Sequence, residues 1–130
     1  MHGALQIPIV NQSDIAHASR KARDLAVIAG FDKSRSYHVA TAASELAWNV
    51  LLHGGGGMLE VSLLPGCLGI ELLASDAGPG IADPVLAMQE GYSSSGSLGC
   101  GLSGIARLMD DLVIDSTVGQ GTRVRACKWL

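Results

Sequence analysis

Two kinds of hydrophobic periodicity divide this chain into a helical first half and a strand-rich second half. Apolar residues recur at helical spacing over 15–29 and again over about 34–53. Two pairs of strand patterns follow, with one more helical segment, 102–109, between the pairs. Helices and strands segregated in this way predict an α+β fold. We expect a two-layer α/β sandwich whose sheet is mixed but mostly antiparallel, with the helices packed on one face.

Capping residues and turns predict where the elements begin and end. Residues 5–10 contain Pro8, which fits an edge strand better than a central one. Ser13 or Asp14 can cap the first helix, and Gly30 can end it. The other expected elements are strands at 58–64 and 69–75, a short helix at 83–89, a loop at 90–101, and strands at 112–118 and 122–129.

Length and composition restrict the class of protein. A chain of 130 residues has the length of one ordinary domain, so we expect a single domain over residues 1–130. The net charge of −3, with only 9 Lys and Arg, argues against a nucleic-acid surface. No apolar stretch approaches the roughly 20 residues needed to cross a bilayer. The N-terminus also lacks a secretory signal. We therefore expect a cytoplasmic protein without a nucleic-acid or membrane partner.

Three cysteines, Cys67, Cys100 and Cys127, match neither a metal clamp nor a disulfide framework, so we expect reduced thiols. Glycine is more informative, because many of the 17 glycines gather in segments 54–57, 76–80 and 96–104. Glycine clusters permit close approaches that a side chain would block.

The segment D-A-G-P-G places Asp76 at the end of an expected strand. A carboxylate there can accept a hydrogen bond from an exocyclic amine, and Gly78 and Gly80 allow a flat ring to lie against bare backbone. The same residues are also typical of an ordinary turn after a strand. Taken alone, this segment favours the turn.

The segment G-S-L-G-C-G-L-S-G leads directly into the helix expected at Leu102. Free backbone N–H groups and the positive end of a helix dipole suit such a place to phosphate. The lysine and hydroxyl residue of a Walker motif are missing, however, and a lone glycine-rich loop is weak evidence.

Glu45 and Asn49 lie four residues apart in an otherwise apolar helical run, so they share one helix face. An amide oxygen is a suitable ligand for Mg²⁺, and a carboxylate one turn away could accept a proton from an attacking hydroxyl. For an isolated pair, a solvated helix face is the simpler interpretation.

The combination of these elements, in this order and followed by a late G-T before the last strand, resembles the GHKL superfamily of ATP-binding domains. The resemblance covers almost the whole chain. Within the superfamily, the stretches A-T-A-A-S-E-L-A-W-N-V, R-L-M-D and the terminal K-W-L are similar to the small bacterial serine kinases that act on STAS-domain proteins, the anti-sigma-factor and stressosome switch kinases of the RsbT type.

The resemblance implies a role for each matching residue. Glu45 would be the general base, Asn49 the Mg²⁺ ligand, and Asp76 the partner of the adenine amino group of ATP. Gly78 and Gly80 would lie beside the adenine, and Thr122 would place a hydroxyl near it. The phosphate loop would comprise Ser97, Leu98, Gly99, Cys100, Gly101 and Leu102.

The resemblance also implies a function: an ATP- and Mg²⁺-dependent protein serine kinase that phosphorylates a STAS-domain regulator in a bacterial stress or sigma-factor partner-switching pathway. A PP2C-type phosphatase or a sigma factor would be a further partner. Two alternatives stay open: an anti-sigma factor that sequesters a sigma factor in a nucleotide-dependent way, and a histidine-kinase fragment or ATPase. Trp48 is either a core residue or a partner-facing anchor, and the core is favoured.

Overall fold

The computed structural model describes residues 4–78, 101–117 and 119–130. Helices and strands account for most of these residues. In chain order they are β1 (Leu5–Ile9), α1 (Gln12–Ala29), α2 (Lys33–Leu52), β2 (Gly57–Leu63), the single 3₁₀ turn η1 (Pro65–Cys67), β3 (Gly69–Asp76), α4 (Gly101–Leu108), β4 (Asp111–Thr117) and β5 (Gly121–Trp129).

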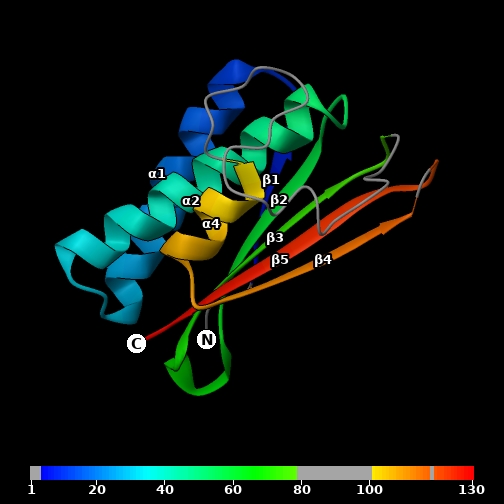
Figure 1. The fold of residues 1–130 in the computed structure, drawn as a ribbon. Coiled ribbons are helices and arrows are strands. Elements are labelled where there is room, and N and C mark those ends of the chain that lie inside the picture. The colour runs from blue at the N-terminus through cyan, green and yellow to red at the C-terminus, as the bar shows by residue number, and fades with distance from the viewer. Residues whose placement is uncertain (1–3, 79–100, 118) are drawn as a thin grey trace.

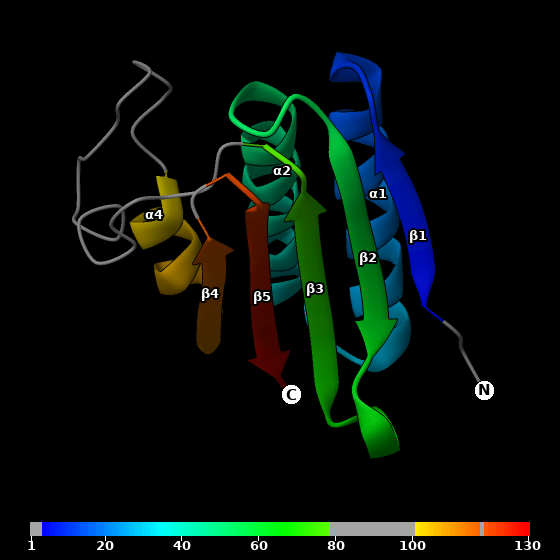
Figure 2. The ribbon, with the colours of Figure 1, turned by 90° about the vertical axis from the view of Figure 1, so that its right-hand side faces the viewer.

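The strands form one sheet in the order β1-β2-β3-β5-β4, and each described pairing is antiparallel. Figure 2 shows the sheet from its uncovered face, with the helices behind it. In Figure 1 the helices form a single layer on the other side. The expected α+β sandwich is therefore confirmed, and its described sheet is antiparallel throughout rather than mixed. The strand containing Pro8 lies at an edge, as expected.

The register places two different sets of residues at the two ends of the sheet. Asp76 pairs with Gly57 of β2 on one side and with Thr122 of β5 on the other. The last residue of β5, Trp129, pairs with Gly69 at the opposite end, whereas Leu5, the first residue of β1, lies at the level of Leu72, about halfway along β3. The end of β5 is therefore remote from Asp76 (Figure 1).

Asn11, and neither Ser13 nor Asp14, caps α1. The Asn11 side chain accepts a hydrogen bond from the backbone N–H of Asp14, and the Asp14 carboxylate accepts one from the backbone N–H of Asn11 at 3.1 Å. The expected cap is therefore wrong, because Asp14 takes the reciprocal position of a capping box. Gly30 ends α1 with a φ of 108°, as expected.

The core lies between the sheet and the helical layer. Alanines dominate the buried faces of α1 and α2, and their small side chains allow the two helices to pack closely against each other. The sheet contributes larger side chains. Fully buried examples are Ile9, Leu59, Val61, Ile70 and Leu72.

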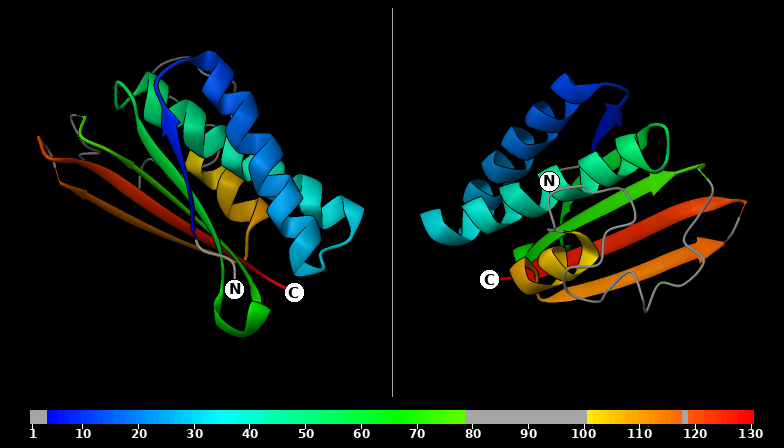
Figure 3. Two further views of the ribbon diagram at one scale, coloured as in Figure 1. Left: turned by 180° about the vertical axis from the view of Figure 1, so that it is seen from behind. Right: turned by 45° about the horizontal axis from the view of Figure 1, so that its top comes forward.

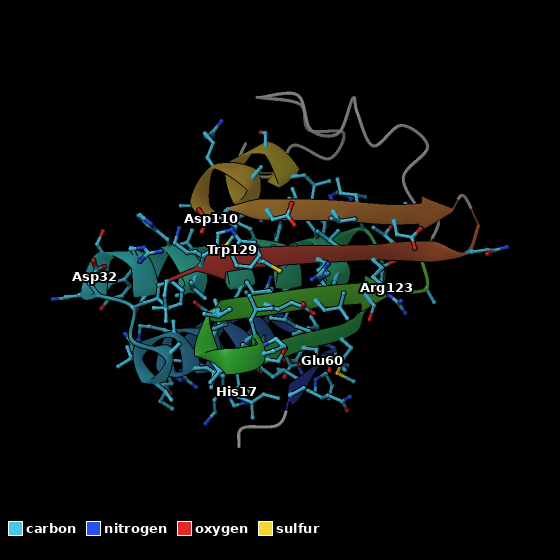
Figure 4. The ribbon with its side chains drawn as sticks, turned by 90° about the horizontal axis from the view of Figure 1, so that it is seen from below. His17, Asp32, Glu60, Asp110, Arg123 and Trp129 are labelled. Atoms are coloured by element: carbon cyan, nitrogen blue, oxygen red, sulfur yellow. The ribbon has the colours of Figure 1, made fainter. Side chains whose placement is uncertain are left out.

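Lys128 of β5 connects α4 to the sheet by a hydrogen bond on the helix-covered side. Its side chain is only 7% exposed, and its Nζ donates a hydrogen bond of 2.7 Å to the carbonyl of Leu108, at the C-terminal end of α4. Just beyond the helix, Asp110 accepts a 2.7 Å hydrogen bond from the backbone N–H of Trp129. Figure 4 shows these two residues together at one end of β5. Cationic side chains stabilise a helix C-terminus, where carbonyl groups lack helical partners.

The hairpins β2–β3 and β4–β5 are confirmed, and α4 begins one residue before its expected start. The short helix expected at 83–89 and residues 90–100 of the expected loop lie outside the described residues.

None of the helices in the described part of the chain combines the length and apolar character that a membrane span requires.

Candidate functional site

Asp76 ends β3 in a setting that only glycines can supply. A Cβ on Gly54 would lie 2.3 Å from the Cγ of Asp76, and a Cβ on Gly78 would lie 2.7 Å from the Cα of Gly54. The Asp76 Oδ1 accepts a 2.9 Å hydrogen bond from the backbone N–H of Gly78. The turn after α2 therefore lies directly against the carboxylate at the end of β3.

The sequence analysis placed Gly54 in a glycine cluster that permits close approaches, but it did not identify the contact with Asp76. It also missed Gly121, which has a φ of 106° and whose added Cβ would lie 2.1 Å from the Asp76 carbonyl oxygen. The Gly54 contact joins the turn after α2 to the end of β3, and the Gly121 contact depends on the pairing of β3 with β5. The local signal that could have identified the region is the unusual concentration of glycine.

Thr122 lies directly opposite Asp76 in the β3–β5 register. Its Oγ1 lies 3.0 Å from the Oγ of Ser116, which is the residue opposite Thr122 on β4. Ser116 also donates a 3.3 Å hydrogen bond to the carbonyl of Gly121. The structure therefore brings the predicted residues Asp76 and Thr122 together and adds the hydroxyl of Ser116, which the sequence analysis missed.

This arrangement can recognise a flat group that carries an amine. The Asp76 carboxylate is half-buried, and within the described part of the chain its Oδ2 accepts no hydrogen bond. An ionised carboxylate oxygen is an acceptor for an exocyclic N–H. The glycines leave bare backbone beside it, against which a planar ring can lie.

Glu45 and Asn49 are placed by the helix that ends at this same point. Both side chains are half-buried on α2, and neither makes a hydrogen bond to another described residue. The Asn49 carbonyl accepts backbone hydrogen bonds from His53 at 2.9 Å and from Gly54 at 3.3 Å. The last turn of α2 thus connects the polar pair to the glycine that packs on Asp76.

Partial burial raises the pKa of Glu45 above its ordinary value of 4.5, because desolvation disfavours the charged carboxylate. A raised pKa makes the ionised form a stronger base than an exposed glutamate. The described residues include no group of three or more His, Cys, Asp or Glu side chains that could hold a metal ion. Asn49 supplies an amide oxygen of the kind that Mg²⁺ accepts.

The predicted phosphate loop is described only in part. Gly101 is the first residue of α4, and the Leu102 side chain lies in the core with 6% of its surface exposed. Leu102 can therefore meet a ligand only through its backbone. The other predicted residues of the phosphate loop, Ser97, Leu98, Gly99 and Cys100, lie outside the described residues, as does Gly80, which was predicted to lie beside the adenine, and their roles stay predictions.

Residues 10–128 match the family described as the histidine kinase-like ATPase domain. The chain belongs to this family. Membership confirms the resemblance to the GHKL superfamily, and an ATPase family implies ATP as the nucleotide. The serine/threonine-protein kinase RsbT of Bacillus subtilis (strain 168) is 39% identical over 126 residues, which are 95% of each chain. The expected RsbT type of family member is therefore confirmed.

A second relative and a solved structure are also similar to the chain. The anti-sigma F factor of Clostridium botulinum (strain Eklund 17B / Type B) is 35% identical over 99 residues, which cover 69% of this chain and 68% of that protein. The crystal structure of the RsbU and RsbW domains of Rv1364c from Mycobacterium tuberculosis superposes with a TM-score of 0.70 at 16% identity. That match covers 99% of this chain and 33% of the other, and it supports the fold alone.

Proposed function

We propose that this chain is an ATP- and Mg²⁺-dependent protein serine kinase whose substrate is a serine of a STAS-domain regulator, in a partner-switching pathway. The family and the kinase relative support serine/threonine kinase activity. The STAS-domain substrate, the metal and the residue roles are proposed from the arrangement of the candidate site. A PP2C-type phosphatase or a sigma factor is proposed as a second partner.

The observation that carries this proposal is the position of Glu45 and Asn49 on the α2 helix, which leads directly into the turn that packs against Asp76. Two polar side chains without partners among the described residues share one face of a rigid helix. Phosphoryl transfer needs mainly such positioning and electrostatic stabilisation from a protein.

In the proposed reaction the serine hydroxyl attacks the γ-phosphorus of ATP. A new bond forms between the serine oxygen and phosphorus, and the bond from phosphorus to the β–γ bridging oxygen breaks, which releases ADP. Glu45 takes the hydroxyl proton, and the raised pKa of its carboxyl group suits this role. Asp76 and Thr122 hold the adenine ring, with the Asp76 carboxylate accepting from the amino group.

The side-chain oxygen of Asn49 would hold the magnesium ion, whose remaining ligands would be water and phosphate oxygens. Bound Mg²⁺ would neutralise part of the negative charge on the phosphates. Gly101 and the backbone at the start of α4 would face phosphate oxygens, where free N–H groups and the helix dipole favour negative charge.

The test is intact-mass spectrometry of STAS-domain proteins from the same genome after incubation with the chain, ATP and Mg²⁺. We expect one STAS-domain protein to gain the mass of one phosphate. Glu45→Gln should slow the transfer by at least about a hundredfold while leaving ATP binding intact. Glu60→Gln is a matched control, because Glu60 lies on β2, away from the helical layer (Figure 4).

The alternative function is an anti-sigma binding module, and the identity with anti-sigma F factors favours it as second candidate. This function predicts nucleotide-dependent co-purification of a sigma factor, without phosphate transfer to a STAS-domain protein. Phosphate transfer that Glu45→Gln leaves undiminished would instead remove Glu45 from the role of base.

A further inference from the structure

A groove of about 610 Å³ lies between α1 and α2. Figure 3 shows these two helices side by side in the helical layer. Ser19 of α1 donates a 2.9 Å hydrogen bond to the carbonyl of Ala40 on α2 and so ties the helices together within the groove. Trp48 also lines the groove and is only half-buried, so the favoured interpretation of this residue as core is wrong.

The groove runs beside the proposed catalytic base. Thr41 and Trp48 line it, and they lie four residues before and three residues after Glu45 on the same helix. Residues at these spacings are neighbours on a helix surface. A protein segment in the groove would therefore lie next to Glu45, on the side away from Asn49.

The groove is cationic although the whole chain carries a net charge of −3. Arg20 and Arg23 line it, and no Asp or Glu is among the lining residues that the structure describes. Arg23 is held in place, since its Nη1 donates a 3.3 Å hydrogen bond to the Tyr37 hydroxyl and its guanidinium lies over the Tyr37 ring. Arg20 is exposed and, within the described ranges, makes no ion pair.

The Trp48 indole ring forms an aromatic part of the groove surface. Its Nε1 is buried and has no hydrogen-bond partner in the part of the chain that the structure describes. An unpaired buried donor is energetically unfavourable, and packing holds the indole ring. A segment that shifts the ring slightly on docking would offer this N–H an acceptor and recover part of that cost.

We infer that the α1–α2 groove docks an acidic segment of the serine-bearing protein substrate, with a carboxylate facing Arg20 and an apolar side chain against Trp48. This inference rests on the proposed function for the identity of the substrate. Charge complementarity selects an acidic segment, and the position beside Glu45 selects the protein that delivers the serine.

The test compares Arg20→Glu with Lys21→Glu, which makes the same charge change at an exposed position outside the groove. The readouts are the Kd of the STAS-domain proteins by calorimetry, the KM for the same proteins, and the Kd for ATP. We expect Arg20→Glu to raise the first two by at least about tenfold. Lys21→Glu should change them by less than about twofold, and neither variant should alter ATP binding.

Trp48→Phe keeps an aromatic ring and removes the N–H. We expect it to raise the KM for the STAS-domain protein by about threefold to tenfold, without a change in kcat. Equal effects of Arg20→Glu and Lys21→Glu, or none from either, would overturn the docking inference. Circular dichroism of each variant separates a loss of docking from a loss of folding.

The outcomes also separate this inference from the proposed function. Phosphate transfer with unchanged Kd and KM in Arg20→Glu would support the proposed kinase function and contradict substrate docking in the α1–α2 groove. Binding of a STAS-domain protein that requires Arg20 but leads to no phosphate transfer would support docking in the groove and contradict the proposed kinase function. A wild-type chain that neither binds nor phosphorylates any STAS-domain protein would overturn both.

Discussion

Gly54 leaves no room for a side chain against Asp76, since an added Cβ would lie 2.3 Å from the Asp76 Cγ. Gly54→Ala must therefore displace the carboxylate, which is the group proposed to recognise adenine. We expect this variant to weaken ATP binding by at least about tenfold, as measured by calorimetry.

The matched control for that prediction is Gly55→Asn. Gly55 has a φ of 74°, and an added Cβ there would meet no atom within 4 Å. Asparagine tolerates this backbone conformation better than most residues. ATP affinity within about twofold of wild type is expected for the control. Equal loss in both variants would mean that the turn as a whole, and not its contact with Asp76, matters.

The pH dependence of the reaction should reveal the environment of Glu45. Because burial raises its pKa above 4.5, kcat should fall on the acid side at a higher pH than an exposed glutamate would give. Phosphate transfer measured against pH checks this expectation. An acid limb that persists unchanged in the residual activity of Glu45→Gln would contradict the assignment.

The same group links stability to pH. The pKa of Glu45 is higher in the folded than in the unfolded chain, so its favourable contribution is present below the unfolded pKa and is lost as pH rises through the folded pKa. Glu45→Gln should therefore raise the Tm at about pH 7, and much less at about pH 4. Calorimetric unfolding at the two pH values, with Glu60→Gln as control, measures the difference.

Thr122→Val removes the hydroxyl next to Asp76 while preserving the shape of the side chain. The loss of one hydrogen bond predicts ATP binding that is weaker by about threefold to tenfold. Thr122→Ser keeps the hydroxyl and should bind ATP nearly as wild type does. A similar affinity in all three proteins would exclude a direct role for Thr122.

Lys128→Met keeps an unbranched side chain but removes the 2.7 Å hydrogen bond to the Leu108 carbonyl. The unpaired carbonyl predicts a loss of about 1–3 kcal/mol in the free energy of unfolding. Denaturant titration tests this value. Arg123→Met is the control, because Arg123 is exposed at the other end of β5 (Figure 4), and it should change stability by less than about 0.5 kcal/mol.

Most described elements could be predicted because their patterns are local. Glycine at position 30 and the two strand pairs mark boundaries within a few residues of where they occur. The start of α1 was misplaced because Asn11, Ser13 and Asp14 are all capping residues within one turn. Hydrophobic periodicity does not distinguish between such neighbours, whereas the reciprocal hydrogen bonds do.

The candidate site was only partly predictable for a different reason. Glu45 and Asn49 follow from helical spacing, and the pairing of Asp76 with Thr122 was implied only by resemblance. The contact of Gly54 with Asp76 brings together two segments that are separate in the sequence, and the hydroxyl pair of Thr122 and Ser116 depends on the exact register of the β4–β5 hairpin. Trp48 was assigned to the core because its residue type favours burial, but its helix face meets α1 at a groove.

The end of the last strand has a practical consequence for linked domains. Trp129 lies at the end of the sheet remote from Asp76. A label, a surface tether or a second folded unit attached beyond this residue can therefore be kept away from the nucleotide side by a short linker. A chain immobilised beyond Trp129 should retain its ATP affinity, which makes surface-based titration suitable for measuring how its partners exchange.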